Sequence, residues 1–198
     1  MKNISFLKLD LLRELGSIGA GHAATSLSEL ANTQVDMSVP EIRLYPSQRI
    51  MDRLKDEEYF VLRSRLEGGI SGMGYLVLSL GEARPLAGLL LGADPASVDM
   101  DGDMAQSALK EAANILLSSY MSALGDLTGF TVLADVPAMD GPINKNDVEK
   151  HISDAPADDI VYVKSNLTIK RLGFDAALLF VPDQKSLRAI FAKLGLPE

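Results

Sequence analysis

The chain has no cysteine, only two histidines, and no apolar run near the roughly 20 residues of a membrane-spanning helix. The absence of cysteine excludes disulfides and thiol chemistry, and it fits a reducing cytoplasm. His22 and His151 are too few and too isolated for a histidine metal site, so we expect no cofactor or metal of the protein's own. The N-terminal segment is charged early and lacks the apolar stretch of a signal peptide, so we predict a cytoplasmic location.

Basic residues are outnumbered, with 19 Lys and Arg against 27 Asp and Glu, for a net charge of −8. This balance disfavours nucleic acid and anionic membranes as partners, because both require a basic face. Six acidic residues and only two lysines lie between positions 138 and 159, a net of −4. We interpret this segment as a solvated loop, and the alternative is an acidic rim that attracts a basic partner. The 198 residues are 47% hydrophobic, which is enough for a sizeable core.

The most informative stretch runs from Ser107 to Pro137. On a helix, Ser107, Glu111, Asn114 and Ser118 fall in one polar stripe, and apolar residues cluster on the opposite side. Side chains at i and i+3 are neighbours on a helix surface. A carboxylate and a carboxamide therefore point away from the core, close enough to act together.

The same pattern recurs near the N-terminus. A shift of 97 positions aligns eight identical residues over 31 positions without a gap. The aligned polar positions and prolines are Asp10 and Ser107, Glu14 and Glu111, Ser17 and Asn114, and Pro40 and Pro137. We interpret this as an internal duplication. It predicts one domain, residues 1–198, made of two half-repeats at about 1–97 and 98–198 that share a core.

The order helix, strand, strand, strand, helix occurs twice. The predicted helices are 7–31, 47–57, 82–92, 104–127 and 183–195, and the predicted strands are 34–45, 58–67, 74–80, 130–138, 159–168 and 174–182. Hairpin connections favour antiparallel pairing, so we predict an α+β fold with helices on one sheet of about six strands. Gly16, Gly19 and Gly21 predict a close approach of helix and sheet, and His22 is predicted to be a partly buried packing residue.

Glu111 and Asn114 offer neither a nucleophile with an adjacent base nor a metal cluster. A carboxamide can, however, accept a hydrogen bond from water while it donates one to a phosphoryl oxygen. This arrangement positions water for in-line attack, as a glutamine does in GTPases. Asn114 could thus hydrolyse an aspartyl phosphate on a partner that brings its own metal and lysine, and Glu111 could pair with that lysine. The hydroxyl of Ser17 is too short for this bridge, so the first site is predicted to be impaired or a docking surface.

The motif Asp/Ser, three residues, Glu, two residues, Asn, twenty-two residues, Pro resembles the signature of the CheC/CheX/FliY family of chemotaxis phosphatases. It is complete as Ser107, Glu111, Asn114 and Pro137, whereas Ser17 stands where the family has Asn. The run LDLLRELGSIGAGHAATSLSELANTQVDMSVPEI also looks like the first helix and strand of CheC proteins.

This resemblance implies a pseudo-twofold duplicated fold in which two long helices carry the two sites. It also implies that the chain dephosphorylates a CheY-like receiver domain that binds Mg²⁺. Glu111 would hold a lysine of the receiver and Asn114 would orient the attacking water. Ser107, Pro137, Asp10 and Pro40 would be supporting positions.

Two alternatives remain open at this point. CheC proteins also look like partners of the receptor deamidase CheD, so the chain could be a non-catalytic adaptor. The related FliM and FliY proteins build the flagellar switch, so it could instead be a structural interaction protein. The complete second motif disfavours the inactive, FliM-like branch.

Overall fold

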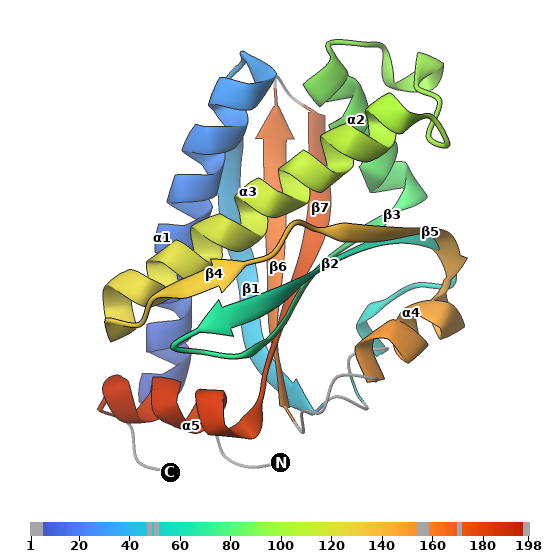
Figure 1. Ribbon diagram of the computed structural model, residues 1–198. Helices are drawn as coiled ribbons and strands as arrows, with labels where there is room; N and C mark the ends of the chain where they lie inside the picture. Colours follow the sequence, from blue (N-terminus) through green and yellow to red (C-terminus); the bar gives the residue numbers. More distant parts are fainter. Residues whose placement is uncertain (1–5, 47–48, 50–51, 154–158, 170–171, 196–198) are drawn as a thin grey trace.

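The computed structural model describes residues 6–46, 49, 52–153, 159–169 and 172–195 of the chain. Long helices lie across a strongly curved sheet (Figure 1). In chain order the elements are α1 (Phe6–Ala31), β1 (Asp36–Pro46), β2 (Glu58–Gly68), β3 (Gly72–Ser79), α2 (Leu80–Leu91), the 3-10 turn η2 (Pro95–Ser97), α3 (Asp103–Thr128), β4 (Val132–Ala134), β5 (Ala138–Asn144), α4 (Lys145–Ser153), β6 (Asp159–Ile169), β7 (Leu172–Pro182) and α5 (Gln184–Lys193).

The strands form a single seven-stranded sheet in the order β1-β6-β7-β3-β2-β4, with β5 also paired to β2. Every pair in the sheet is antiparallel. The first strand of each half pairs with the second strand of the other half: β1 lies against β6, and β4 and β5 lie against β2. The predicted α+β fold with one antiparallel sheet and duplicated units is therefore confirmed. The position of the boundary between the half-repeats, near residue 97, stays a prediction.

The pseudo-twofold axis passes through the middle of the sheet, where β3 pairs with β7. Leu76 lies opposite Leu178, and Val77 lies opposite Ala177. A shift of 101 positions, which also places Gly72 on Gly173, moves Leu76 onto Ala177 and Val77 onto Leu178. The shift therefore converts the pair Leu76 and Leu178 into the pair Val77 and Ala177, and the reverse. The sheet is thus symmetric in register as well as in strand order.

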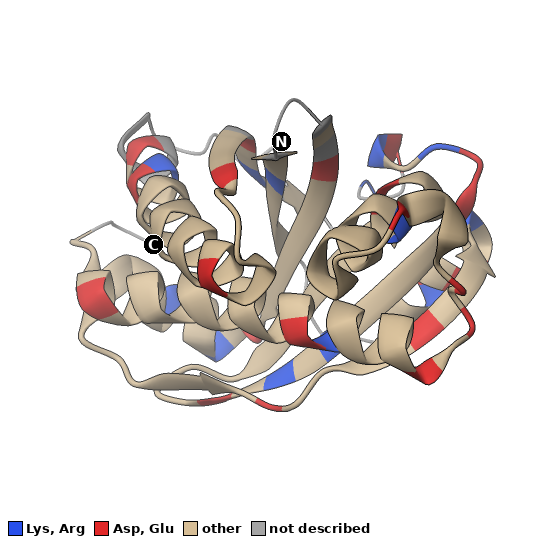
Figure 2. Ribbon diagram, turned by 90° about the horizontal axis from the view of Figure 1, so that it is seen from above, with Lys and Arg blue, Asp and Glu red and all other residues tan. Residues whose placement is uncertain are grey.

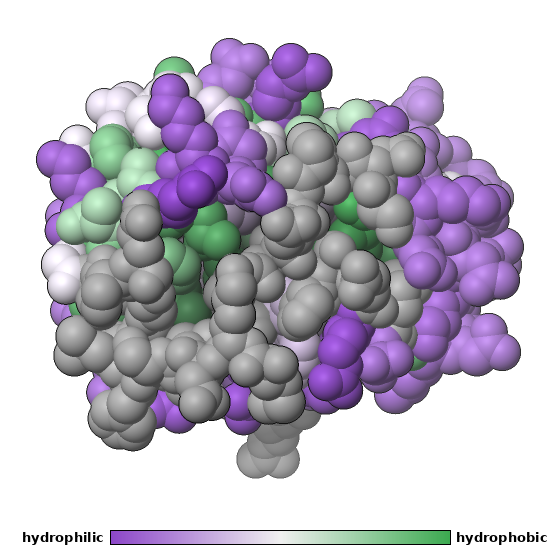
Figure 3. Space-filling model, turned by 90° about the horizontal axis from the view of Figure 1, so that it is seen from below, coloured by the Kyte–Doolittle hydropathy of each residue, from purple (hydrophilic) through white to green (hydrophobic). Residues whose placement is uncertain are grey.

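Two cores lie on opposite faces of the sheet. The larger one holds α1, α2 and α3 against the sheet and includes the fully buried Leu62, Leu109 and Leu116. The smaller one lies under α4, where Val148 and Ile152 pack on the tyrosines and valines of the central strands. Viewed from below, hydrophilic residues cover one side of the molecule, and hydrophobic residues are visible elsewhere on this face (Figure 3). Burial of apolar side chains on both faces fixes the sheet between its helices.

Helices α1 and α3 cross in front of the sheet and are in contact (Figure 1). A methyl group added at Gly19 of α1 would lie 2.7 Å from a ring carbon of Tyr120 in α3. Tyr120 is fully buried, and its hydroxyl group shares a hydrogen bond of 3.1 Å with the Ser165 hydroxyl group of β6. Burial raises the pKa of Tyr120 to about 12. The missing side chain at position 19 therefore sets how closely the two long helices approach each other.

The three glycines of α1 differ in what lies next to them. Gly16 faces Val39 and Ile42 of β1, with a methyl position 3.3 Å from Val39, so the predicted approach of helix and sheet is confirmed there. Gly19 instead serves a contact between two helices. Gly21 is exposed, and an added methyl group would have no neighbour within 4 Å.

These differences predict opposite effects for the same substitution. We expect Gly19→Ala to destabilise the fold by about 1–3 kcal/mol, because the new methyl group overlaps the Tyr120 ring. Gly21→Ala should instead stabilise it by about 0.5–1 kcal/mol, since alanine loses less backbone entropy in a helix and finds open space here. Urea unfolding of the two variants measures both changes. Equal free energies of unfolding for the two variants would contradict the close crossing.

Four sequence predictions need correction. The single strand expected at 130–138 is the two strands β4 and β5. The segment expected to be a solvated loop contains α4, whose Val148 and Ile152 are buried. The described residues of the helix expected at 47–57 include 3-10 turns but no α-helix. His22 is exposed and not a packing residue, because it follows Gly21 on the outer side of α1.

Candidate active site

Helix α3 places the motif on the outside of the molecule. Its inner side is anchored by fully buried apolar residues, among them Leu109, Ala112, Ala113, Leu116 and Tyr120. The helix begins after Gly102 and ends at Gly129, which takes the left-handed conformation and donates its backbone N–H to the carbonyl of Gly125. With the apolar side fixed on the core, the helix must turn its polar stripe outward.

Glu111 and Asn114 are both accessible. The side chains of Ser107, Glu111 and Ser118 are exposed, and that of Asn114 is half-buried. Within the part of the chain that the structure describes, Glu111 and Asn114 make no side-chain hydrogen bond or ion pair. The carboxylate of Glu111 and the amide of Asn114 are three positions apart on one helix, so they lie side by side. Both groups are available for hydrogen bonds to another molecule.

The two prolines of the motif occupy equivalent irregular places in the sheet. Pro137 is buried in the short gap between β4 and β5. Pro40 lies inside β1, where the pairing with β6 shifts register between Ser38 and Glu41. A proline has no N–H for the ladder, so an irregularity at each position is expected. The strand predicted at 34–45 therefore runs through Pro40, with a bulge there.

The first copy of the motif lies on α1 in the equivalent place. Glu14 and Ser17 are exposed, and Asp10 is half-buried. The Asp10 carboxylate accepts a hydrogen bond of 3.2 Å from the exposed Arg13, with which it forms an ion pair. Glu14 and Ser17 make no side-chain bond to described residues. Both copies thus present their acid to solvent, but only the second presents an amide.

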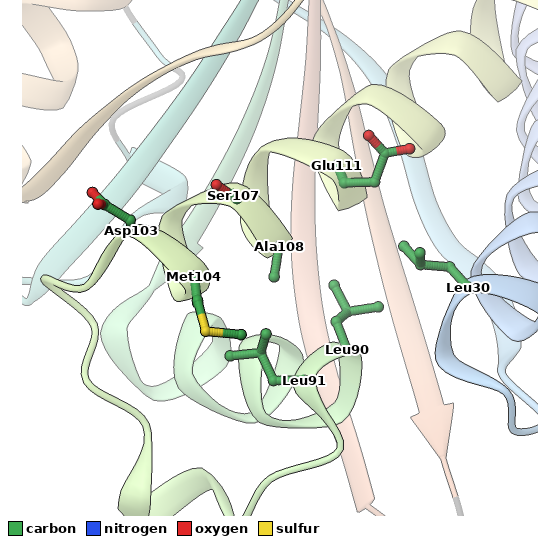
Figure 4. Close-up of a pocket in the computed structure, with 8 residues that line it drawn as sticks. All are labelled: Leu30, Leu90, Leu91, Asp103, Met104, Ser107, Ala108 and Glu111. Atoms are coloured by element: carbon green, nitrogen blue, oxygen red, sulfur yellow. The ribbon is translucent and has the colours of Figure 1, made fainter.

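A pocket of about 330 Å³ lies directly beside the second motif, and sequence reasoning missed it. Glu111 and Ser107 of α3 line one side, together with Ala108 (Figure 4). The remaining wall is formed by Leu30 at the end of α1, Leu90 and Leu91 at the end of α2, and Asp103 and Met104 at the start of α3. These segments are far apart in sequence, so no local pattern could reveal the pocket. The available signal was Met104, a large apolar residue directly after Asp103 at the start of the helix.

The described residues contain no group of three or more His, Cys, Asp or Glu side chains arranged to hold a metal ion. Among them, no helix is long and apolar enough to cross a bilayer. His151, the second histidine, lies far from α3 in the smaller core region, where its Nδ1 atom is 2.7 Å from the Arg63 guanidinium.

Two stretches of the chain, residues 7–43 and 104–139, match the model of the CheC-like family. The predicted resemblance is confirmed. The matched stretches begin 97 positions apart, which is the shift that aligns the two halves of the sequence. Each CheC-like stretch contains one long helix, its acidic motif residue and the strand segment that follows.

Relatives of known name agree with this match. The chain is 28% identical to the CheY-P phosphatase CheC of Bacillus subtilis (strain 168), over 95% of this chain and 94% of that protein. It is 29% identical to the flagellar motor switch phosphatase FliY of the same organism, over 86% of this chain but only 45% of that protein.

Solved structures share the fold. FliY of Thermotoga maritima superposes with a TM-score of 0.80 at 22% identity, with 98% of each chain covered. CheX in the CheX-CheY-BeF3-Mg complex of Borrelia burgdorferi superposes with a TM-score of 0.53 at 15% identity, over 84% of this chain and 96% of that chain. At these identities the likeness concerns the fold alone.

Proposed function

We propose that this chain is a phosphatase of a phosphorylated CheY-like response regulator in chemotaxis signalling, and that α3 carries the active site. The observation that carries the proposal is the accessible, unbonded pair of Glu111 and Asn114 inside a CheC-like stretch. Relatives named CheY-P phosphatase CheC and flagellar motor switch phosphatase FliY support it. The proposal includes the cytoplasmic location expected from the cysteine-free sequence.

In the proposed reaction, the Asn114 carbonyl oxygen accepts a hydrogen bond from a water molecule, and its N–H₂ group donates one to a phosphoryl oxygen. The water oxygen then attacks phosphorus in line with the bond to the aspartate oxygen. That bond breaks, inorganic phosphate leaves, and the receiver regains its aspartate carboxylate. A Mg²⁺ ion held by the receiver domain would neutralise the charge of the phosphoryl group.

Glu111 has a positioning role in this scheme. Its carboxylate pairs with a lysine of the receiver's active site, which fixes the orientation in which the phosphoryl group meets Asn114. Ser107 lies one helical turn before Glu111 on the contacting face, and the buried Pro137 shapes the strand segment near the helix. The enzyme contributes positioning, and the reactive groups come with the substrate.

The direct test is release of inorganic phosphate from a phosphorylated receiver domain. We expect catalytic amounts of the protein to accelerate release over many turnovers. A stable stoichiometric complex without faster release would instead favour a binding role. The adaptor alternative, with CheD as the partner, would then be tested by co-purification with CheD.

The fold leaves a switch-like role as the second candidate. The middle domain of FliM from Helicobacter pylori superposes with a TM-score of 0.69 at 13% identity, so the architecture alone does not separate an enzyme from a scaffold. The Glu111 and Asn114 pair favours the enzyme over the scaffold, and the phosphate-release assay distinguishes the two roles.

The first site offers a test by gain of function. In an Asn114→Ala background, we expect Ser17→Asn to restore phosphate release by about tenfold, because it supplies the amide beside Glu14 that the first copy lacks. The matched control is Ser17→Asp, which has the same shape but no N–H donor. An unchanged rate with Ser17→Asn would mean that more than the amide is missing at the first site.

A further inference from the structure

The pocket beside Glu111 combines an apolar floor with two acidic ends. Leu90, Leu91 and Met104 form its lower side beneath Ala108, and Glu111 and Asp103 stand at opposite ends (Figure 4). Met104 leaves 73% of its surface exposed and Leu30 leaves 42%, so apolar side chains are open to solvent on two sides of the pocket. A hollow of this size with an apolar floor can take one apolar side chain of another molecule beside Glu111.

We propose that an apolar side chain of the receiver domain binds in this pocket while the receiver's active-site lysine pairs with Glu111. The inference rests on the proposed function and specifies how the substrate protein is recognised. Because Glu111 itself lines the pocket, a partner that reaches its carboxylate lies at the edge of the hollow. Methionine is flexible and polarisable, so Met104 can adapt to the side chain that enters.

Charge around the pocket indicates the character of the partner surface. Between positions 93 and 103 the chain has four exposed aspartates and no lysine or arginine. The view from above, onto this end of the molecule, shows acidic residues, with some basic residues between them, along its helices and loops (Figure 2). The fitting surface is therefore an apolar residue flanked by basic ones, as a receiver that presents its lysine would offer.

A second copy of this chain is the less suitable occupant. Each copy carries a net charge of −8, and the pocket's own surroundings are acidic. Self-association through this face would bring two acidic rims together, and like charges at an interface are costly. The receiver domain is thus the occupant to which the inference commits.

The test compares two exposed apolar residues. We expect Met104→Ser to raise the KM for the phosphorylated receiver about tenfold while kcat stays within about twofold, because Met104 contributes docking but touches no reacting group. Met104→Leu, which keeps the apolar surface, should retain most of the affinity. The matched control is Leu133→Ser on β4, which is 65% exposed but lies outside the pocket and should leave KM unchanged.

A second measurement separates this inference from the proposed function. Binding of the beryllofluoride-loaded receiver, followed by calorimetry, needs no turnover. If the wild type binds without hydrolysing phosphate and Met104→Ser weakens binding, docking stands and the phosphatase proposal fails. If the wild type hydrolyses phosphate and Met104→Ser matches it in KM and affinity, docking is overturned. Sedimentation showing that Met104→Ser dissolves a dimer, with receiver binding unaltered, would also overturn it, in favour of a second copy.

Discussion

Replacing Asn114 with alanine is expected to lower kcat for phosphate release by about a hundredfold, while the free energy of unfolding changes by less than about 0.5 kcal/mol. The catalytic loss follows from removing the group that holds water and phosphoryl oxygen together. Stability should be kept because Asn114 is half-exposed and makes no bond to described residues that its loss would break. Single-turnover phosphate release and urea unfolding measure the two quantities on the same preparation.

Two further variants sharpen this expectation. Asn114→Asp keeps the shape but replaces the donor with a negative charge, so it should be as inactive as alanine. Ser122→Ala changes an exposed residue on the same helix outside the motif and should retain full activity. Full activity in Asn114→Ala would remove Asn114 from the mechanism.

Charge reversal at Glu111 is the second change with a large expected effect. Glu111→Lys should lower kcat/KM by about a hundredfold, because it replaces an attractive contact with the receiver's lysine by a repulsive one. Glu111 is exposed and has no described partner within the chain, so folding should be unaffected. Steady-state phosphate release measures the decrease in kcat/KM. Repeating it at several salt concentrations shows how much of that decrease is electrostatic, because salt screens interactions between charges.

The control is Asp126→Lys, which makes the same change of net charge near the other end of α3. Both variants alter long-range attraction of a charged receiver alike, so the difference between them isolates the local contact. Equal losses in the two variants would show that Glu111 acts only through net charge and would end its assignment as a docking residue.

The two long helices could be predicted closely from the sequence. Helix α3 was expected at 104–127 and spans Asp103–Thr128, because its apolar residues repeat with helical spacing and glycines flank both ends. The outward direction of Glu111 followed from the same repeat. The duplicated sheet followed from the alignment of the halves and from hairpin connections.

Other features depend on contacts that no local pattern records. Helix α4 was missed because only Val148 and Ile152 are apolar anchors in a mostly polar segment, and their burial depends on a sheet face built from distant strands. The pocket beside Glu111 joins the ends of three helices. Exposure of His22 could not be inferred from glycine spacing, since Gly19 packs against α3 while Gly21 faces solvent.

The exchange of strands between the halves explains why a copy of the motif without its amide can persist. Strand β1, contributed by the Ser17 copy, supplies the backbone partner of β6, and β2 does the same for β4 and β5. A chain cut near residue 97 would leave each fragment with orphaned N–H and C=O groups. Loss of the amide from one copy therefore cannot be followed by deletion of that copy. The half that carries Ser17 is retained as scaffolding for the half that carries Asn114.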